Sequence, residues 1–218
     1  YTKRYFDLGP SQVKAYKELS DLYRTEVAGK EVTTMLAITQ LLRLQQIASG
    51  FIAVDDGDIK LLDDNPRLGA LKDVLDETEG KVIVWAKFTR EIDDVIALCN
   101  TIGIEVVRYD GQTTDEDRAL AIDAFQRGSA KVFVANPAAA GTGLTLHAAK
   151  TVVYYSNSFK LVDRLQSEDR AHRIGQHNPV LYLDLIANGT IDEKIVDALR
   201  SKLDIASVIT GDKIKEWI

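Results

Sequence analysis

Short apolar runs recur between residues 81 and 186, and they constrain the fold more than any other feature of this chain. The runs are KVIVWA (81–86), IEVVRY (104–109), KVFVA (131–135), TVVYY (151–155) and VLYLDLI (180–186). Most of them are continuously apolar and do not alternate with polar residues. Such runs are typical of parallel strands that are buried on both faces of a sheet. The sequence therefore predicts a buried parallel sheet.

Amphipathic segments separate these runs and predict helices at 89–101, 114–127 and 160–173. Thr114 with Asp117, and later Thr190 with Glu193, have the spacing of helix N-terminal capping residues. Strands that alternate with helices in this way fold into a doubly wound sheet with right-handed connections. We therefore expect an α/β fold.

The first 64 residues follow a different pattern. Gly9-Pro10-Ser11 predicts the start of one helix, residues 34–49 predict a second, and Gly50 is its expected stop. FIAVDDGDIKLL (51–62) predicts a small hairpin around Asp56-Gly57. We expect a helical and hairpin appendage over 1–64, the sheet domain over 65–200 and a tail over 201–218.

Composition excludes several classes of protein. A formal net charge of -6 argues against a surface that is basic throughout, although it leaves room for a local basic groove. Cys99 is the only cysteine, so an internal disulfide is excluded and a thiolate zinc site is not expected. No apolar run reaches the roughly 18 residues of a membrane helix. We expect an intracellular protein that has no membrane partner.

The histidines do not indicate a metal site. His147, His172 and His177 lack a carboxylate-rich pattern around them. Zinc and other transition metals need several ligands at suitable spacing. We therefore predict no metal bound by this chain.

Function in such a sheet is expected in the loops at the carboxyl ends of the strands. The loop after the third run, NPAAAGTGLTL, contains Gly141-Thr142-Gly143. Its glycines allow a close backbone approach and offer amide groups to an anion. A glycine pair of this kind is a weak signal, and on its own an ordinary tight turn is the preferred explanation.

The helix after the fourth run carries QSEDRAHRIGQ (166–176). At about 100° per residue, Gln166, Arg170 and Arg173 fall within about 60° of one another on the helix. Arginine side chains match phosphate oxygens in a bidentate manner and stay charged. This stripe could therefore hold a phosphate group.

A second interpretation of the same helix stays open. Leu161, Leu165 and His172 cluster on another side of the helix and are the expected packing face. Glu168 and Asp169 would then partly neutralise the arginines on a solvated face. Without further context, the solvated surface is the favoured interpretation of this charge run.

Further segments occur in the order of the superfamily-two helicase motifs. AGTGLTLHAAKTVVYYSNSF (140–159) resembles motif V, and QSEDRAHRIGQ resembles motif VI in the form typical of the Swi/Snf-related DNA translocases. Weaker resemblances cover further parts of the chain. KVIVWAKFTREIDDV resembles motif IV, and YDGQTTDEDRALAIDAF resembles the segment after it. PVLYLDLIANGTIDEKIVDAL resembles the closing strand and helix, and LGPSQVKAYKEL with LLRLQQIASGF resembles the linker between the motor lobes.

This resemblance implies that the chain is the second, C-terminal RecA-like lobe of a two-lobe motor. In that family, the arginines that match Arg170 and Arg173 reach across the cleft to the β- and γ-phosphates of ATP. Gln166 matches the glutamine that opens motif VI and orients the nucleotide. Gly141 and Gly143 match motif V glycines whose amides face the nucleotide or the DNA.

The resemblance also implies partners. Phosphates of one DNA strand would contact Lys87, Gly111, Thr113 and Thr142, which positions a motor without reading sequence. ATP and Mg²⁺ are expected in the full two-lobe protein, with the N-terminal lobe of the same parent as the protein partner. No cofactor is expected on this chain alone. The segment between motifs V and VI is short, which suggests a compact bacterial or phage motor in the cytoplasm or nucleoid.

The given sequence lacks the phosphate-binding loop of such motors. Gly29-Lys30 is followed by Glu31, and Gly80-Lys81 by Val82, so no G-x-x-x-x-G-K-[ST] occurs. Nor does an acidic box follow an apolar strand, and the isolated chain is therefore predicted not to hydrolyse ATP. Two alternatives remain: a non-catalytic RecA-like module that docks protein or DNA, and a self-contained nucleotide-binding α/β protein.

Overall fold

The computed structural model describes residues 1–27, 34–53, 58–139, 144–171 and 179–202. The chain forms two compact units. The first comprises residues 1–4, 68–158 and 162–185, and the second comprises residues 5–67, 159–161 and 186 onward. The expected division into 1–64, 65–200 and 201–218 follows the order of the chain and stays a prediction.

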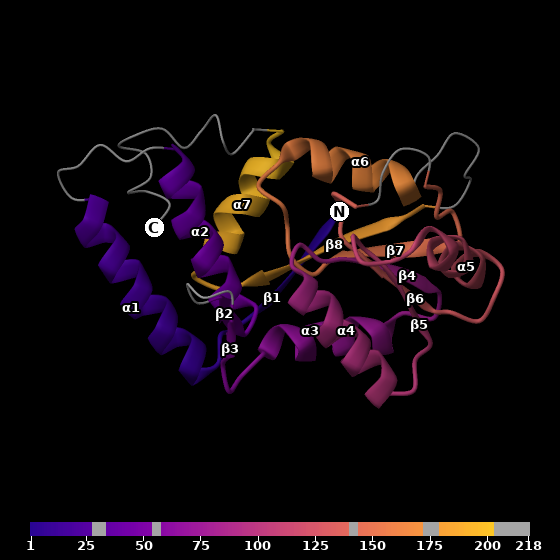
Figure 1. The fold of residues 1–218 in the computed structure, drawn as a ribbon, viewed down its shortest axis with the longest axis horizontal. Helices are drawn as coiled ribbons and strands as arrows, with labels where there is room; N and C mark the ends of the chain where they lie inside the picture. The colour runs from indigo at the N-terminus through magenta and orange to yellow at the C-terminus, as the bar shows by residue number, and fades with distance from the viewer. Residues whose placement is uncertain (28–33, 54–57, 140–143, 172–178, 203–218) are drawn as a thin grey trace. The chain divides into compact units, whose positions relative to one another are not determined.

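A six-stranded sheet is built mainly from the first unit (Figure 1). Its spatial order is β1-β8-β7-β4-β6-β5. The strands are β1 (Thr2–Phe6), β4 (Lys81–Trp85), β5 (Val106–Tyr109), β6 (Val132–Ala135), β7 (Ala149–Tyr154) and β8 (Leu181–Ala187). Pairing is parallel between β4 and both β6 and β7, between β5 and β6, and between β7 and β8. The predicted parallel α/β sheet is confirmed, since the apolar runs form β4 to β8.

Strand β1 is not predicted by the apolar pattern. Its sequence, TKRYF, has basic residues at Lys3 and Arg4 and lies at one edge of the sheet. An edge strand has a neighbour on one side only, so its side chains need not be apolar on both faces. This is why a search for continuous apolar runs misses it.

Helices cover both faces of the sheet. Figure 1 shows α6 (Leu161–Ala171) over one face, and α3 (Pro66–Glu77) and α4 (Thr89–Thr101) over the other. The helix α5 (Asp115–Gln126) begins after Thr114, whose hydroxyl accepts a hydrogen bond from the Asp117 amide at 3.2 Å. The helices predicted at 89–101 and 114–127 are thus confirmed, and the one predicted at 160–173 is confirmed as far as residue 171.

Alternate strand residues build an apolar core on one face of the sheet. The members of this cluster come from the strands, from α5 and α6, and from the segment before β7: Ile83, Trp85, Tyr109, Ala121, Phe125, Phe133, Ala135, Leu144, Leu146, Ala149, Val152, Tyr154, Ala171 and Tyr182. Because α5 and α6 both contribute, they pack on the same face of the sheet. Trp85 is fully buried, so it belongs to the core and is not exposed to stack on a base.

Cys99 is buried in α4, and burial raises the pKa of its thiol to about 11. A thiol of that kind is protonated at neutral pH and inert as a nucleophile.

No helix in the described part of the chain is long and apolar enough to span a bilayer.

The second unit contains the predicted appendage elements. Helix α1 (Pro10–Val27) begins at the expected proline, and α2 (Thr34–Ala48) ends just before Gly50, whose φ is +84°. Strands β2 (Phe51–Ala53) and β3 (Ile59–Leu61) pair antiparallel, which confirms the hairpin, although Asp56-Gly57 lies outside the described residues. Any side chain at residue 50 would be strained in the left-handed region.

The C-terminal helix α7 (Ile191–Arg200) packs on α2 in a separate apolar cluster that includes Leu41, Leu44, Ile195 and Leu199. Thr190 caps α7, but its hydroxyl accepts from the Asp192 amide at 3.2 Å and not from the expected Glu193 amide. The Glu193 carboxylate instead accepts from the Gly189 amide at 2.8 Å.

A buried ion pair ties the start of α3 to α7 within the second unit. The Arg67 side chain is fully buried, and its Nη2 lies 2.5 Å from Oδ2 of Asp192, whose side chain is 5% exposed. Arg67 also donates to the Ala48 carbonyl and lies over the Phe6 ring at 5.0 Å. A buried charge of this kind is tolerated only while it is paired.

We expect Arg67→Ala to lower the free energy of unfolding by about 3–5 kcal/mol, because it leaves the Asp192 carboxylate buried without its partner. Denaturant unfolding at neutral pH measures this change. The control is Arg24→Ala, which removes an exposed pair with Asp21 at 3.6 Å and should cost less than about 1 kcal/mol. Equal effects of the two variants would contradict the assignment.

Candidate functional site

The carboxyl ends of β4 and β7 lie side by side in the sheet, but the chain leaves them in opposite directions. From β4 it passes through α4 to β5 at one edge, whereas from β7 it passes through α6 toward β8 on the other side. Neighbouring strands with diverging connections leave a crevice outside their carboxyl ends. Ligands bind at such points in α/β sheets, so the candidate site begins here.

Polar side chains join the loops that follow three of these strands. Ser156, after β7, accepts a hydrogen bond from the Lys87 amide at 2.8 Å and donates to Glu91 at 2.5 Å. Asn136, after β6, donates to the Lys87 carbonyl at 2.7 Å. Glu91 is fully buried and also accepts from the Phe88 amide at 3.0 Å. The backbone of Lys87 is therefore fixed on both sides.

Lys87, predicted to contact DNA phosphate, is half-buried directly after β4. Its Nζ lies 5.2 Å from the centre of the Phe88 ring. Cation–π contacts of partly exposed lysines are worth about 0.5–1 kcal/mol, so the amine is oriented rather than locked. A held backbone with an oriented ammonium group is a suitable geometry for a phosphate contact.

The other described DNA candidates, Gly111 and Thr113, lie in the turn after β5. The Thr113 hydroxyl accepts from the Asp110 amide at 2.9 Å and donates to the Asp110 carboxylate at 3.2 Å. The Gln112 amide donates to that carboxylate at 2.9 Å. Gly111 is exposed, and a Cβ added there would meet nothing within 4 Å. The Thr113 hydroxyl is thus engaged within the turn, whereas the backbone at Gly111 is open.

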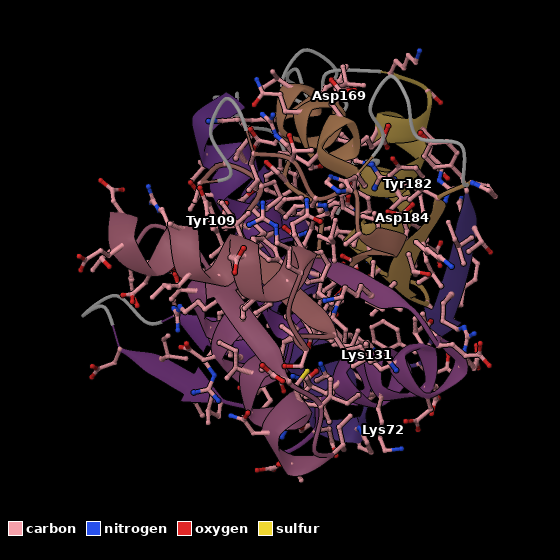
Figure 2. All side chains as sticks on the ribbon, turned by 90° about the vertical axis from the view of Figure 1, so that its right-hand side faces the viewer. Lys72, Tyr109, Lys131, Asp169, Tyr182 and Asp184 are labelled. Atoms are coloured by element: carbon pink, nitrogen blue, oxygen red, sulfur yellow. The ribbon has the colours of Figure 1, made fainter. Side chains whose placement is uncertain are left out.

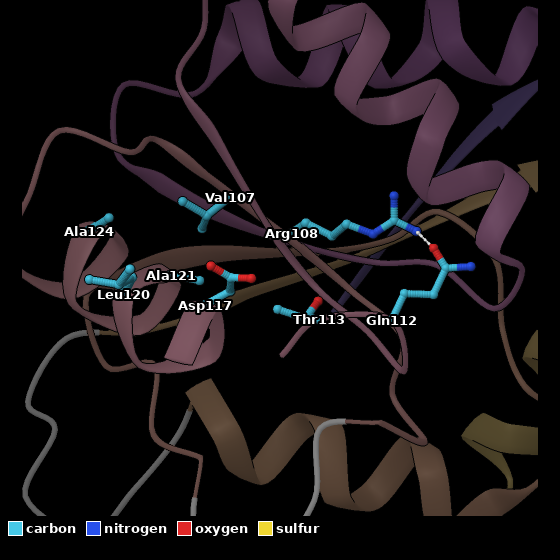
Figure 3. A pocket seen from close by; sticks show the side chains of 8 residues that line it. All are labelled: Val107, Arg108, Gln112, Thr113, Asp117, Leu120, Ala121 and Ala124. Atoms are coloured by element: carbon cyan, nitrogen blue, oxygen red, sulfur yellow. Dashed lines mark hydrogen bonds between the residues drawn. The ribbon is translucent and has the colours of Figure 1, made fainter. Parts of the chain in front are cut away.

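Arg108 neutralises the carboxylate of this turn. Its Nη2 lies 2.6 Å from Asp110 and donates to Gln112 at 3.1 Å (Figure 3). Burial alone would raise the pKa of the Asp110 carboxyl, but the Arg108 guanidinium and the Gln112 amide hold that pKa below its ordinary value. Arg108 and Thr113 line an open hollow of about 490 Å³ beside α5.

Helix α6 carries Gln166 and Arg170, but its packing face differs from the expected one. The buried residues are Arg164, Ser167 and Ala171. The expected packing residue Leu165 is 42% exposed. The prediction that Leu161, Leu165 and His172 form the packing face is therefore wrong at Leu165, and His172 lies outside the described residues. An arginine takes the place of a leucine because it finds buried partners on the sheet.

Arg170 meets the segment that follows the glycine pair. Its carbonyl accepts from the Leu146 amide at 2.9 Å, and its Nη1 lies 3.5 Å from the Leu144 carbonyl. Residue 144 comes directly after Gly143, so the structure brings the end of the glycine loop to the arginine helix. Gln166 is exposed one turn earlier on α6.

The Arg170 side chain is only half-buried, but its Nε is buried and has no hydrogen-bond partner. Within residues 1–27, 34–53, 58–139, 144–171 and 179–202, Arg170 forms no ion pair. A buried polar atom without a partner costs about 1–3 kcal/mol, and the Nε atoms of Arg90 and Arg118 share this status. Gly141, Thr142, Gly143 and Arg173 lie outside the described residues.

Sequence reasoning missed several residues of this region, namely Glu91, Asn136, Ser156, Arg164 and Asp184. One signal was available: Asp184 interrupts the apolar run VLYLDLI, and a charge inside a buried strand requires a partner. No comparable signal marks Ser156 or Asn136, whose roles depend on strand ends that meet only in the folded sheet. Among the described residues, no group of three or more His, Cys, Asp or Glu side chains is placed to hold a metal ion.

Removing the Asp110 carboxylate tests the turn after β5. We expect Asp110→Asn to lower the free energy of unfolding by about 1–3 kcal/mol at pH 7, because it removes buried, charge-assisted hydrogen bonds. The folded-state pKa of Asp110 lies below its unfolded value. Its stabilisation is therefore full above the unfolded pKa of about 3.9 and is lost as the pH falls through the folded pKa.

Unfolding of both proteins between pH 2 and pH 7 measures this dependence. The difference between wild type and Asp110→Asn should shrink below about pH 4. Asp123→Asn, on the exposed face of α5, is the control and should change stability little at any pH. A difference for Asp110→Asn that is constant across the range would contradict the assignment.

Comparison with protein families gives a match to the helicase conserved C-terminal domain over residues 66–175. The ATP-dependent helicase fft1 of Schizosaccharomyces pombe is 36% identical over 136 residues, which is 62% of this chain and 14% of the relative. A SWI/SNF-related matrix-associated actin-dependent regulator of chromatin (subfamily A member 1) from Mus musculus is 37% identical over 61% of this chain and 13% of its own length. The chain thus spans only a small part of these relatives.

Two solved structures share the fold. The crystal structure of the C-terminal part of the Fun30 ATPase domain has a TM-score of 0.76 at 22% identity, covering 99% of this chain and 94% of that one. The Sulfolobus solfataricus SWI2/SNF2 ATPase core in complex with double-stranded DNA has a TM-score of 0.73 at 24% identity, covering 94% of this chain and 45% of that one.

Proposed function

Since this chain belongs to the helicase conserved C-terminal domain family, in its Swi/Snf-related branch, we propose that it is the second lobe of an ATP-dependent DNA translocase. The chain matches 45% of the Sulfolobus solfataricus core, which leaves room for another lobe in a protein of that kind. The N-terminal lobe of the same parent is the proposed partner. ATP would bind between the two lobes.

The observation that carries this proposal is the position of Arg170. It lies where α6 meets Leu144, at the end of the glycine loop, and its buried Nε has no partner among the described residues. A guanidinium held in this way can donate to phosphate oxygens and stabilise the charge that develops in phosphoryl transfer. Arg170 and Arg173 are proposed as arginine fingers, with Gln166 orienting the nucleotide.

Other groups would complete the nucleotide contacts. The amides of Gly141 and Gly143 are proposed to face the phosphates or the DNA backbone. Mg²⁺ would neutralise phosphate charge, and its ligands are proposed on the partner lobe, because the described residues of this chain contain no suitable group. The described side of the site supplies the Arg170 guanidinium, which suits an anionic ligand but not a metal ion.

DNA is the second proposed ligand. Lys87 is the best-supported contact, because its backbone is fixed by Ser156 and Asn136 and the residue is only half-buried. The open backbone at Gly111 is compatible with a nearby phosphate. Thr113 is less suitable through its hydroxyl, which Asp110 engages, and Thr142 lies outside the described residues. Contacts of this kind go to the DNA backbone, so binding would be insensitive to sequence.

We propose an intracellular location, because the relatives above are named as a helicase and as a regulator of chromatin. Both relatives are eukaryotic, and the second structure above is archaeal. A bacterial or phage origin, with a nucleoid location, gains no support from them.

The docking-module alternative would be favoured by cleft arginines locked in internal ion pairs. Arg170 forms no such pair within the described ranges, so the catalytic proposal is the better supported.

The self-contained nucleotide-binding alternative needs a phosphate loop after its first strand. Residues 86–91 after β4 read AKFTRE and contain no glycine.

Turnover by the two-lobe parent tests the proposed role. We expect Arg170→Ala and Arg173→Ala each to lower the DNA-stimulated kcat for ATP hydrolysis by about 10³-fold or more, the magnitude typical of arginine fingers. Arg170→Lys should recover little, because a lysine cannot donate in a bidentate manner. The isolated chain should show no turnover.

The matched control is Arg127→Ala on α5, whose side chain is 84% exposed and pairs with Asp123. It should leave kcat and KM unchanged. A folded Arg170→Ala parent that turns over ATP as fast as the control would remove the arginine-finger assignment.

A further inference from the structure

Helix α6 is attached to the sheet by a buried cation where a leucine would be expected. Arg164 is 5% exposed and lies on the face of α6 that also buries Ser167 and Ala171. Asp184 of β8, labelled in Figure 2, is fully buried. Each charge would be costly to bury alone, so the helix can dock only in a position that pairs them.

The Arg164 guanidinium has partners on every side. Its Nη1 lies 2.5 Å from Oδ1 of Asp184 and donates to the Asn157 side chain at 2.9 Å. Its Nε lies 2.6 Å from Glu168, one turn along the helix. Its Cζ lies 3.5 Å from the centre of the Tyr154 ring on β7. Two strands, one loop and the helix itself thus converge on one side chain.

Two further hydrogen bonds connect residues around Arg164. Asn157 donates to Asp184 at 3.1 Å, and the Tyr154 hydroxyl is 2.8 Å from the Ser167 hydroxyl. Burial by itself lowers the pKa of Arg164, but Tyr154, Asp184 and Glu168 raise that pKa above its ordinary value. The guanidinium is therefore charged at every pH at which the protein is folded.

This arrangement specifies both the rotation and the axial position of α6. Apolar side chains can shift slightly against one another and keep most of their contacts. A planar guanidinium with four directional partners cannot shift without losing hydrogen bonds. Arg170 follows Arg164 by six residues, which is about 9 Å along the helix at 1.5 Å per residue. A rotation by one residue, about 100°, would turn Arg170 away from the Leu144 carbonyl.

We propose that the Arg164–Asp184 pair is a positioning device that sets the register of α6 and so aims Arg170 at the nucleotide. This inference rests on the proposed function and deepens it, because it names which residues place the finger. Arg164 is a positioning residue, since its donors are all directed to protein groups. A purely stabilising pair would not need to affect turnover in a folded variant.

The test uses the two-lobe parent and measures kcat and KM for ATP with DNA, together with Tm. Arg164→Lys keeps the charge but cannot reach Asp184, Asn157 and Glu168 at once. It should lower kcat about tenfold or more with little change in KM, because small misplacements at remote positions can cost up to about 10²-fold. The control is Arg127→Lys, on the exposed pair with Asp123, which should change nothing.

Exchanging the two charges of the Arg164–Asp184 pair tests whether turnover can be rescued. Arg164→Asp and Asp184→Arg should each lower kcat by about 10²-fold, and the double variant should recover at least about tenfold over either single variant. The apolar pair Arg164→Met with Asp184→Leu should remain folded, because such replacements of buried ion pairs are often tolerated. Its kcat should nevertheless stay well below that of the parent.

Several results would overturn the inference: a folded apolar pair with the kcat of the parent, a folded double swap no faster than the single variants, or an Arg164→Lys variant with unchanged kcat. Arg170→Ala, assayed in parallel, separates the two proposals. If Arg170→Ala abolishes turnover while the Arg164 variants keep it, only the positioning inference fails. If Arg170→Ala keeps turnover, the proposed function fails and the positioning inference fails with it.

Discussion

A guanidinium in the protein interior organises the part of this molecule that is proposed to act on ATP. The charge of Arg164 can stay buried only because Asp184, Asn157, Glu168 and the ring of Tyr154 surround it. These groups come from β8, from the loop after β7, from the next turn of the helix and from β7. Satisfying them together leaves α6 one way to dock on the sheet. The position of every other residue on α6 follows from that constraint.

The packing of α6 on the sheet also brings together two segments, neither of which indicates a function on its own. A glycine loop after a strand and an arginine stripe on a helix each have ordinary structural explanations. The contacts of Arg170 with Leu144 and Leu146 bring the end of one to the face of the other. At the neighbouring strand ends, Ser156 and Asn136 hold the backbone of Lys87. Lys87 thus lies at the carboxyl end of β4, where ligands of such sheets are expected, whereas Arg170 lies beside the segment that leads into the start of β7.

Periodicity in the sequence predicts most of this fold, and the failures have identifiable physical causes. Strands β4 to β8 are continuous apolar runs because both faces of the sheet are covered. Strand β1 is missed because an edge strand can carry Lys3 and Arg4. On α6, a helical wheel ranks Leu165 as core, whereas the structure exposes Leu165 and buries Arg164. The partner that buries Arg164 lies on another strand, so no local pattern contains it.

Arg170 is proposed to belong to an ATP site that another lobe completes. The most direct measurement is an experimental structure of the two-lobe parent bound to DNA, ADP and aluminium fluoride, which mimics the transferring phosphoryl group. We expect a nitrogen of the Arg170 guanidinium within about 3 Å of a fluoride, the range of charge-assisted hydrogen bonds. An Arg170 side chain that points away from the nucleotide, or that pairs with a carboxylate of its own lobe, would contradict the proposed role of Arg170.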